Sequence, residues 1–212
     1  MVKISESVLG DISGKIGPVV AYMRNGESIV REHVIPKDPK TPAQLAQRMK
    51  LKLANNGLRP LKNQINIGYE GTGFTYRKVV GITMKENIVG GYPNLRIDYS
   101  RVKISEGKLQ LPDYANVEFD IKTHTAKFYW DNQTPSNSKL GKSNDLVRIF
   151  LFNEKHMVGL TAPESENREK GFMTIAIPEN WSIDDMHFWL ILRSQHFKDK
   201  SDSLYIKLID NL

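Results

Sequence analysis

Few residues in this sequence could carry out chemistry, and most of them lie far apart. The tightest group of a histidine with carboxylates is Asp184-Asp185-Met186-His187. Carboxylate oxygens and an imidazole nitrogen are ligands that divalent metals accept. In a strand, however, Asp185 and His187 would share a face and Asp184 would not. A polar turn that leads into a strand from His187 to Leu192 explains the same residues, and we favour it over a metal site.

Motifs for nucleophilic catalysis and for phosphate binding are incomplete. Ser136, Ser138 and Ser165 lie in polar stretches with no histidine nearby to act as a base, and no G-x-S-x-G motif is present. Gly71-Thr72-Gly73 resembles the start of a phosphate loop, but Tyr76 stands where that motif needs its third glycine. The chain contains no cysteine, which removes thiolate chemistry and disulfides. We therefore expect no catalytic residue, no bound metal, no cofactor and no enzymatic activity.

One group of basic residues with aromatic neighbours is a candidate for nucleic-acid binding. Its members are Arg48, Lys50, Lys52, Arg59, Lys62, Arg77 and Lys78. Lysine and arginine neutralise phosphates, and exposed Tyr69, Phe74 and Tyr76 would stack on bases. The alternative is that these charges cover solvated helix faces while Tyr69 and Phe74 belong to a core. No helix-turn-helix, zinc-finger or RNA-recognition signature surrounds the group.

The charge of the chain is concentrated in its first half. The chain has 212 residues and a formal charge of +6, and residues 1–95 hold 14 Lys and Arg against 7 Asp and Glu. Residues 96–212 hold 16 against 17, so a basic half is joined to a nearly neutral one. No apolar stretch approaches the roughly 18 residues of a membrane span, and no signal peptide is recognisable. We expect a cytoplasmic protein without a membrane partner, and a virion location fits these features as well.

The first half predicts a β-hairpin and then helices. Asn25-Gly26 separates two β-rich runs, and both residues tolerate the positive φ of a type I′ turn. Thr41 is the expected N-cap of a helix, with Pro42 in its first position and Gln44 reaching back in a capping box. We expect this helix to end near Ala54, where Asn55-Asn56-Gly57 begins, and to bury a stripe of Leu45, Met49 and Leu53. Two further helices are expected over 60–67 and 75–89, ending before Gly90-Gly91-Tyr92-Pro93.

The second half predicts an antiparallel sandwich. Nine β-rich runs follow one another, over 95–104, 108–111, 116–121, 126–130, 146–152, 157–161, 171–177, 187–193 and 204–209. Long polar loops are expected over 135–144 and 163–170. Phe128, Trp130, Phe150 and Leu190 should share one core, as in immunoglobulin and fibronectin type III folds. The fold class is α+β, with a basic domain of hairpin plus helices over 1–93 and an immunoglobulin-like sandwich domain over 94–212.

Several N-terminal motifs resemble a known family. They are Gly14-Lys-Ile-Gly-Pro-Val-Val-Ala-Tyr22, then Arg31, then Asp38-Pro-Lys-Thr-Pro-Ala-Gln-Leu-Ala-Gln-Arg48. The chain resembles, along nearly its full length, a large bacterial family classed only as a domain of unknown function, whose members also have a junction like Tyr92-Pro93. The resemblance implies the hairpin, the helix start and the C-terminal β half, and it implies no activity. Similar helix starts occur in phage-associated or mobile-element-associated proteins.

These features lead to two hypotheses from different classes. The first is a non-enzymatic structural or interaction protein, for example an assembly or virion-like component, whose partner is another protein or further copies of itself. The second is a nucleic-acid-binding module that uses the basic half.

Overall fold

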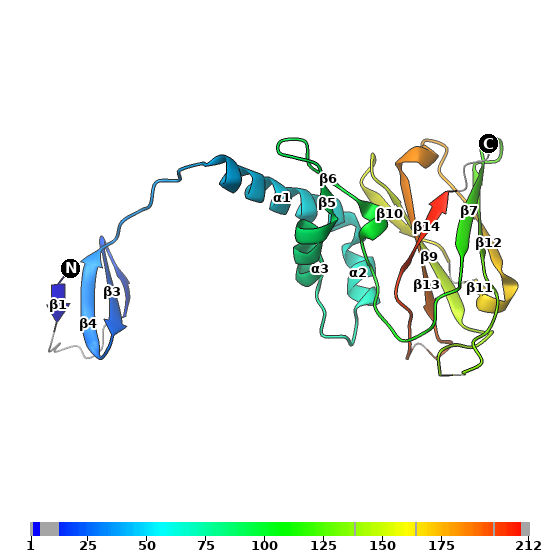
Figure 1. Cartoon of the computed structure of the whole chain (residues 1–212), viewed down its shortest axis with the longest axis horizontal. Coiled ribbons are helices and arrows are strands. Elements are labelled where there is room, and N and C mark those ends of the chain that lie inside the picture. The colour runs from blue at the N-terminus through cyan, green and yellow to red at the C-terminus, as the bar shows by residue number, and fades with distance from the viewer. Residues whose placement is uncertain (1, 5–12, 138, 164, 197, 209–212) are drawn as a thin grey trace. The chain divides into compact units, whose positions relative to one another are not determined.

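The computed structural model describes residues 2–4, 13–137, 139–163, 165–196 and 198–208. The chain forms two compact units, Met1–Thr41 and Pro42–Leu212 (Figure 1). Each unit is described by itself below.

The first unit is a four-stranded antiparallel sheet. Its strands are β1 (Val2–Ile4), β2 (Gly14–Ile16), β3 (Val19–Arg24) and β4 (Glu27–Glu32), in the order β1-β4-β3-β2. Asn25 and Gly26 connect β3 and β4 with φ values of 53° and 78°, so the predicted hairpin is confirmed with its positive-φ turn. Residues 33–41 contain no helix or strand, as the prolines at 36 and 39 predict.

The second unit begins with a layer of helices. They are α1 (Pro42–Leu58), the 3-10 helix η1 (Arg59–Leu61), α2 (Lys62–Gly68) and α3 (Tyr76–Ile82), and a π-helical turn, η2 (Thr83–Asn87), continues from α3. A short pair of strands, β5 (Ile88–Val89) and β6 (Arg96–Ile97), follows, and then the 3-10 helix η3 (Tyr99–Arg101). Among the described residues, no helix combines the length and the apolar character that a membrane crossing requires.

Helix α1 begins where predicted but ends later. It starts at Pro42, and the capping box of Thr41 with Gln44 stays a prediction. The expected stop near Ala54 is wrong, because α1 runs through Asn55-Asn56-Gly57 to Leu58. Gly57 lies inside this helix, and a Cβ at this position would collide with the side chain of Ile97. The glycine permits close packing here instead of ending the helix, so the buried residues of α1 are Ala54, Gly57 and Leu58 and the predicted stripe is only half-buried.

The rest of the second unit is a curled mixed sheet, so the α+β class is confirmed. Its strands are β7 (Ala115–Asp120), β8 (Thr125–Trp130), β9 (Leu146–Asn153), β10 (Val158–Thr161), β11 (Glu166–Asn167), β12 (Phe172–Ala176), β13 (Met186–Arg193) and β14 (Leu204–Leu208). The order is β10-β9-β13-β14-β7-β8-β12, with β11 paired to β9. All of these pairs are antiparallel except β7 with β14, which is parallel.

Seven of the nine predicted β-rich runs form strands close to their expected bounds. Residue 209, the predicted end of the last one, lies outside the described residues. The run 95–104 forms only β6 and η3, and in the run 108–111 only Leu109 makes an isolated bridge, to Ser201. Residues 163–170, predicted as a loop, contain β11 and the 3-10 helix η4 (Arg168–Lys170). A further 3-10 helix, η5 (Ile183–Asp185), precedes β13.

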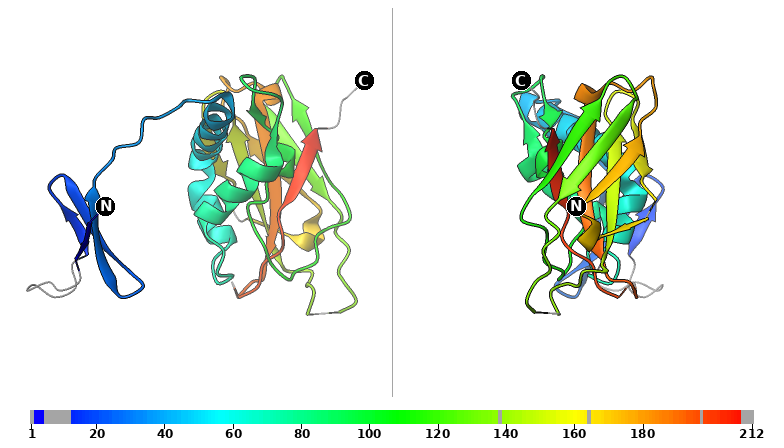
Figure 2. Two further views of the ribbon diagram at one scale, coloured as in Figure 1. Left: turned by 60° about the vertical axis from the view of Figure 1, so that its left-hand side comes forward. Right: turned by 90° about the vertical axis from the view of Figure 1, so that its right-hand side faces the viewer.

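Strands β9 and β13 are buried on both faces. The face inside the curl contributes Val147, Ile149, Leu151, Phe188, Leu190 and Leu192 to one core, together with Phe128 and Trp130. The opposite face contributes Phe150, Phe152, Trp189 and Ile191 to a second core with the helices, which lie on one side of the sheet in Figure 2. Phe150 therefore does not join Phe128, Trp130 and Leu190, which corrects the predicted single core. Alternation along β9 places Phe150 on the helix side.

This second core also moves the expected domain boundary. A division at residue 93 falls inside the second unit, because Leu58, Leu61 and Ile65 share a core with Phe150 and Trp189. The indole N–H of Trp189 donates a hydrogen bond to the carbonyl of Val102 at 2.9 Å. Hairpin and helices, expected in one domain, belong to different compact units.

Fragments of the chain test where it divides. We expect residues 42–212 to melt cooperatively, because both cores are complete within them. Residues 94–212 should lack a cooperative melt, because Phe150, Phe152, Trp189 and Ile191 lose their cover. Exposing each costs about 1.5–3 kcal/mol, which together approaches a typical domain stability of about 5–15 kcal/mol. Circular dichroism melts of both fragments measure this. A cooperative melt of residues 94–212 at the midpoint of the longer fragment would restore the boundary at residue 93.

Candidate functional site

The sheet of the first unit has one apolar and one basic face. The pairing of β2, β3 and β4 sets opposite residues on the same face. One face carries Ile16, Val19, Ala21, Met23 and Val30, with Ser28 and Glu32. The other face carries Lys15, Val20, Tyr22, Arg24, Glu27, Ile29 and Arg31. The sheet is therefore amphipathic.

The apolar face of this sheet, defined by Ile16, Val19, Ala21, Met23 and Val30, is only partly covered. Ile16 is 60% exposed and Met23 38%, whereas Ala21 is buried. In this unit the described buried residues are Ala21, Ser28 and Ile29. On the basic face the guanidinium of Arg31 lies 5.9 Å from the centre of the Tyr22 ring. We did not expect a contact surface of this kind from the sequence. The alternation of side chains along residues 15–23 could have indicated it.

The seven basic residues predicted for nucleic acid lie on the helical layer. Arg48, Lys50 and Lys52 belong to α1, Arg59 to η1, Lys62 to α2, and Arg77 and Lys78 to α3. All are exposed except Lys50, which is half-buried. Residues 42–93 hold 8 Lys and Arg against 2 Glu, so the positive charge of the first half is concentrated in the helices.

The aromatic residues near these charges are not a free stacking surface. Tyr69 is buried and stacks on Phe74 with ring centres 5.0 Å apart, and burial raises the pKa of its hydroxyl to about 12. Phe74 and Tyr76 are half-buried against the same core, and the ammonium of Lys78 lies 5.1 Å from the centre of the Phe74 ring. Tyr69 and Phe74 thus follow the alternative reading, in which they belong to the core.

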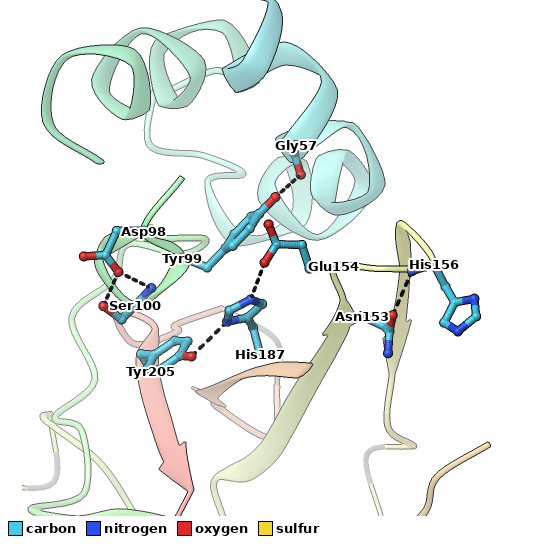
Figure 3. A network of polar contacts seen from close by, with 9 residues as sticks. All are labelled: Gly57, Asp98, Tyr99, Ser100, Asn153, Glu154, His156, His187 and Tyr205. Atoms are coloured by element: carbon cyan, nitrogen blue, oxygen red, sulfur yellow. Dashed lines mark hydrogen bonds and ion pairs between the residues drawn. The ribbon is translucent and has the colours of Figure 1, made fainter. Parts of the chain in front are cut away.

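The chemically most distinctive side-chain cluster surrounds His187. Its Nδ1 lies 2.9 Å from the hydroxyl of Tyr205 on β14, and its Nε2 lies 3.4 Å from Oε2 of Glu154, just after β9 (Figure 3). The Tyr99 ring lies 4.6 Å from the imidazole, and its hydroxyl donates to the carbonyl of Gly57 in α1 at 3.3 Å. This cluster therefore joins three strands or strand ends to the helical layer.

Burial decides the ionisation in this cluster. Burial lowers the pKa of His187 below its usual value, against the opposing effects of Glu154, Asp98 and Asp185. Burial also raises the pKa of the Tyr205 and Tyr99 hydroxyls, which keeps both phenols protonated. At neutral pH the imidazole is uncharged, with both ring nitrogens in polar contact.

The run 184–187, for which the sequence left a metal site as the alternative to a polar turn, leads into β13. Asp184 lies in η5 and is exposed, so the run 184–187 behaves as the polar turn we favoured. Among the residues that the structure describes, no group of three or more His, Asp or Glu side chains is placed to hold a metal. Glu154 and Tyr205 were missed because they lie 33 and 18 residues from His187 in the sequence.

Comparison with models of known families identifies the family to which the chain belongs. A model of one family matches residues 10–207. The chain belongs to DUF6266, a family of unknown function. This confirms the resemblance to a domain of unknown function along nearly the full length. No curated protein matches the chain in sequence.

The environment of His187 predicts a pH-dependent stability. The folded state disfavours the imidazolium, so the unfolded chain binds the proton more readily and the free energy of unfolding falls as pH drops below about 6.5. Tyr99, Tyr205, Glu154, Asp98 and Asp185 are the titratable groups that act on this ring.

We expect the thermal midpoint to fall between about pH 7 and pH 5.5, and His187→Gln to reduce that fall. His196→Gln, which replaces an exposed histidine, is the matched control and should leave the pH profile unchanged. Calorimetry at several pH values measures the midpoints. Parallel profiles for the parent protein and His187→Gln would show that this histidine does not govern acid sensitivity.

Proposed function

We propose that this protein is a non-enzymatic structural protein that assembles with further copies of itself through the apolar face of its N-terminal sheet. The observation that carries the proposal is the alternation in β2, β3 and β4, which leaves Ile16 and Met23 exposed on the same face as Val19, Ala21 and Val30. A virion-like component is one form of such a protein. A bacterial source and a cytoplasmic location stay predictions of the sequence.

A single-layer sheet needs cover on its apolar face. Sheets are stable when that face packs on another layer, and units near 40 residues seldom supply one themselves. The first unit has 41 residues and only three described buried side chains. A second copy is the favoured occupant, because like apolar faces stack sheet on sheet with only Glu32 as a charge among them. On the opposite face Lys15, Arg24 and Arg31 outnumber Glu27 and would repel a copy.

We also infer that the curled sheet is an immunoglobulin-like sandwich. Its strands divide into β10-β9-β13-β14 and β7-β8-β12, and among the described residues the backbone ladder joins the two groups where Lys207 and Leu208 pair with Asn116 and Val117. Phe128, Trp130, Phe188 and Leu190 fill the space inside the curl. Such sandwiches commonly serve as rigid scaffolds, which supports a structural role.

Self-association is tested by native mass spectrometry and analytical ultracentrifugation. We expect the full chain to form dimers or larger species at tens of micromolar and residues 42–212 to stay monomeric. Ile16→Lys with Met23→Lys should weaken assembly at least about tenfold, since each places a charge in an apolar contact.

Val34→Lys is the matched control. It adds the same charge at a valine that is 66% exposed beyond the end of β4, and it should assemble as the parent does. A monomeric full chain, or a double variant that assembles normally, would refute the proposed role of this face.

Nucleic-acid binding by the helical layer is the second candidate function. It is favoured by one observation, the excess of exposed Lys and Arg in residues 42–93. Arg48 and Lys52 are four residues apart on α1 and therefore share one face of the helix. Tyr69 is buried and cannot stack on a base. The affinity would therefore have to come from contacts of Lys and Arg side chains with the phosphates of the nucleic acid.

Binding through phosphates must weaken steeply with salt. Titration of single-stranded and duplex DNA at two ionic strengths, followed by fluorescence anisotropy, measures this. The plot of log affinity against log salt has a negative slope. Arg48→Gln with Lys52→Gln should make this slope shallower by about 0.7–0.9 per lost contact. Lys122→Gln, in the turn after β7, is the control and should bind as the parent does. Absent binding at low salt, or binding insensitive to salt, would exclude this function.

A further inference from the structure

Strand β12 lies at one edge of the curled sheet, and its outer side has no paired strand among the described residues. It is the last strand in the order β14-β7-β8-β12, next to β8, as the right-hand view of Figure 2 shows. The alternation of hydrogen bonds in an antiparallel ladder decides which of its backbone groups face outward.

Two hydrogen bonds at the ends of β12 fix this alternation. The N–H of Trp130 donates to the carbonyl of Gly171 at 3.0 Å, and the N–H of Ile177 donates to the carbonyl of His124 at 2.8 Å. The odd-numbered residues of β12 therefore bond to β8. The N–H and C=O groups of the residues between them point away from the sheet, and these residues are Phe172, Thr174 and Ala176.

The side chains of β12 do not protect this edge. Edge strands are commonly shielded by a charge, by a proline or by a covering segment. Residues 172–176 include neither a charge nor a proline, and Phe172, Thr174 and Ala176 are all exposed. Within the part of the chain that the structure describes, the backbone of β12 makes no hydrogen bond outside its ladder with β8. The edge is therefore free to accept a further strand.

We propose that β12 pairs antiparallel with β12 of a second copy of this chain, about a two-fold axis at Thr174. In this register Phe172 of each copy lies opposite Ala176 of the other. Every outward N–H and C=O group of both strands then has a partner. A register shifted by two residues would leave some of these groups unpaired, and a shift of one residue would exchange the inner and outer faces.

A second copy is the favoured occupant because β12 complements itself. On the outer face the large ring of Phe172, which is 41% exposed, meets the small side chain of Ala176. On the inner face Met173 lies opposite Ile175, which is only half-buried against the core inside the curl and gains apolar cover. Cross-strand pairs of this kind stabilise a sheet.

The charges nearest to this edge do not oppose the pairing. The ammonium groups of Lys127 and Lys170 each lie 5.2 Å from the centre of the Phe172 ring, and Lys170 is paired with Glu166 at 2.7 Å. Lys127 lies opposite Thr174 in the ladder. The two copies of Lys127 are therefore three strand spacings apart, which is about 14 Å and exceeds the Debye length of about 8–10 Å.

The edge contact is weak by itself. A pairing of five residues falls well short of the about 1,200 Å² that a stable interface buries, so it forms near millimolar concentration when it acts alone. Each two-fold contact joins only two copies. A chain that also uses the apolar face of its N-terminal sheet is linked into species larger than a dimer, in which neighbouring copies raise the effective concentration. Growth beyond the dimer rests on the proposed sheet-face contact, whereas the edge pairing does not.

A charge on the two-fold axis tests the pairing in the full chain. Thr174→Lys places two lysines directly opposite each other, and like charges there are destabilising. By sedimentation velocity we expect the parent to form species larger than a dimer and Thr174→Lys to stop at the dimer. Thr161→Lys is the matched control, because it makes the same change at an exposed threonine on β10, the other edge strand. It should assemble as the parent does.

A charge swap shows that the partner of β12 is another β12. Thr174→Glu alone should also stop at the dimer, since it places two carboxylates on the axis. An equimolar mixture of Thr174→Lys and Thr174→Glu should regain the larger species and associate at least about fivefold more tightly than either variant alone. Damage to the fold, or pairing with an unrelated peptide, would give no such recovery.

The edge contact is measured separately in a full chain that carries Ile16→Lys and Met23→Lys. Near millimolar concentration we expect weak dimers of this variant by sedimentation equilibrium, and adding Thr174→Lys should abolish them. If the sheet-face contact is absent and the edge contact is present, this variant and the parent associate equally and both respond to Thr174→Lys. Association that is insensitive to Thr174→Lys in both proteins, or a mixture that regains nothing, would overturn the edge pairing.

Discussion

The burial of β9 and β13 on both faces is the constraint on which the second unit depends. Trp189 is buried toward the helices while its neighbours Phe188 and Leu190 are buried inside the curl. Two adjacent strands can satisfy this pattern only between two apolar layers, so the helices and the rest of the sheet must both be present. Truncating a buried aromatic residue of this size costs about 3–5 kcal/mol, which is a large fraction of the stability of a domain. Sheet and helices therefore form one compact unit.

The same face of these strands becomes polar at both ends. His187 lies at one end with Tyr205 and Glu154, and Arg148 and Arg193 lie at the other. Between these ends Phe150, Trp189 and Ile191 belong to the core shared with the helices. Polar groups thus occur where the helical cover ends, because water or another polar group is needed to solvate them. One end thus holds a neutral imidazole, and the other holds two guanidinium groups.

Local patterns predicted a large part of the fold, and long-range packing explains most errors. Asn25-Gly26 and Pro42 act through their own backbone preferences, so the hairpin and the start of α1 followed from a few residues. Gly57 was misread as a helix stop, because nothing local shows that Ile97 packs against it. Arg168 was assigned to a polar loop. Its side chain is buried, and its guanidinium donates hydrogen bonds to the carbonyls of Gln110 and Gln133. Its partners lie 58 and 35 residues away in the sequence, beyond any local pattern.

The sequence by itself determined the hairpin, the start of the first helix, most strands of the sheet, the α+β class and membership in a family of unknown function. Turn chemistry, capping preference and alternation act over a few residues, and each can be read without knowing what packs where. Only the tertiary structure decided that Phe150 and Trp189 face the helices, that Tyr69 is core, and that Arg148, Arg193 and Lys200 share one cavity. These placements depend on the strand order β9-β13-β14 and on the helices that pack against one face of β9 and β13. The physical reason is that burial and charge crowding are set by neighbours brought together through long loops, whereas local preferences are set by the residues themselves.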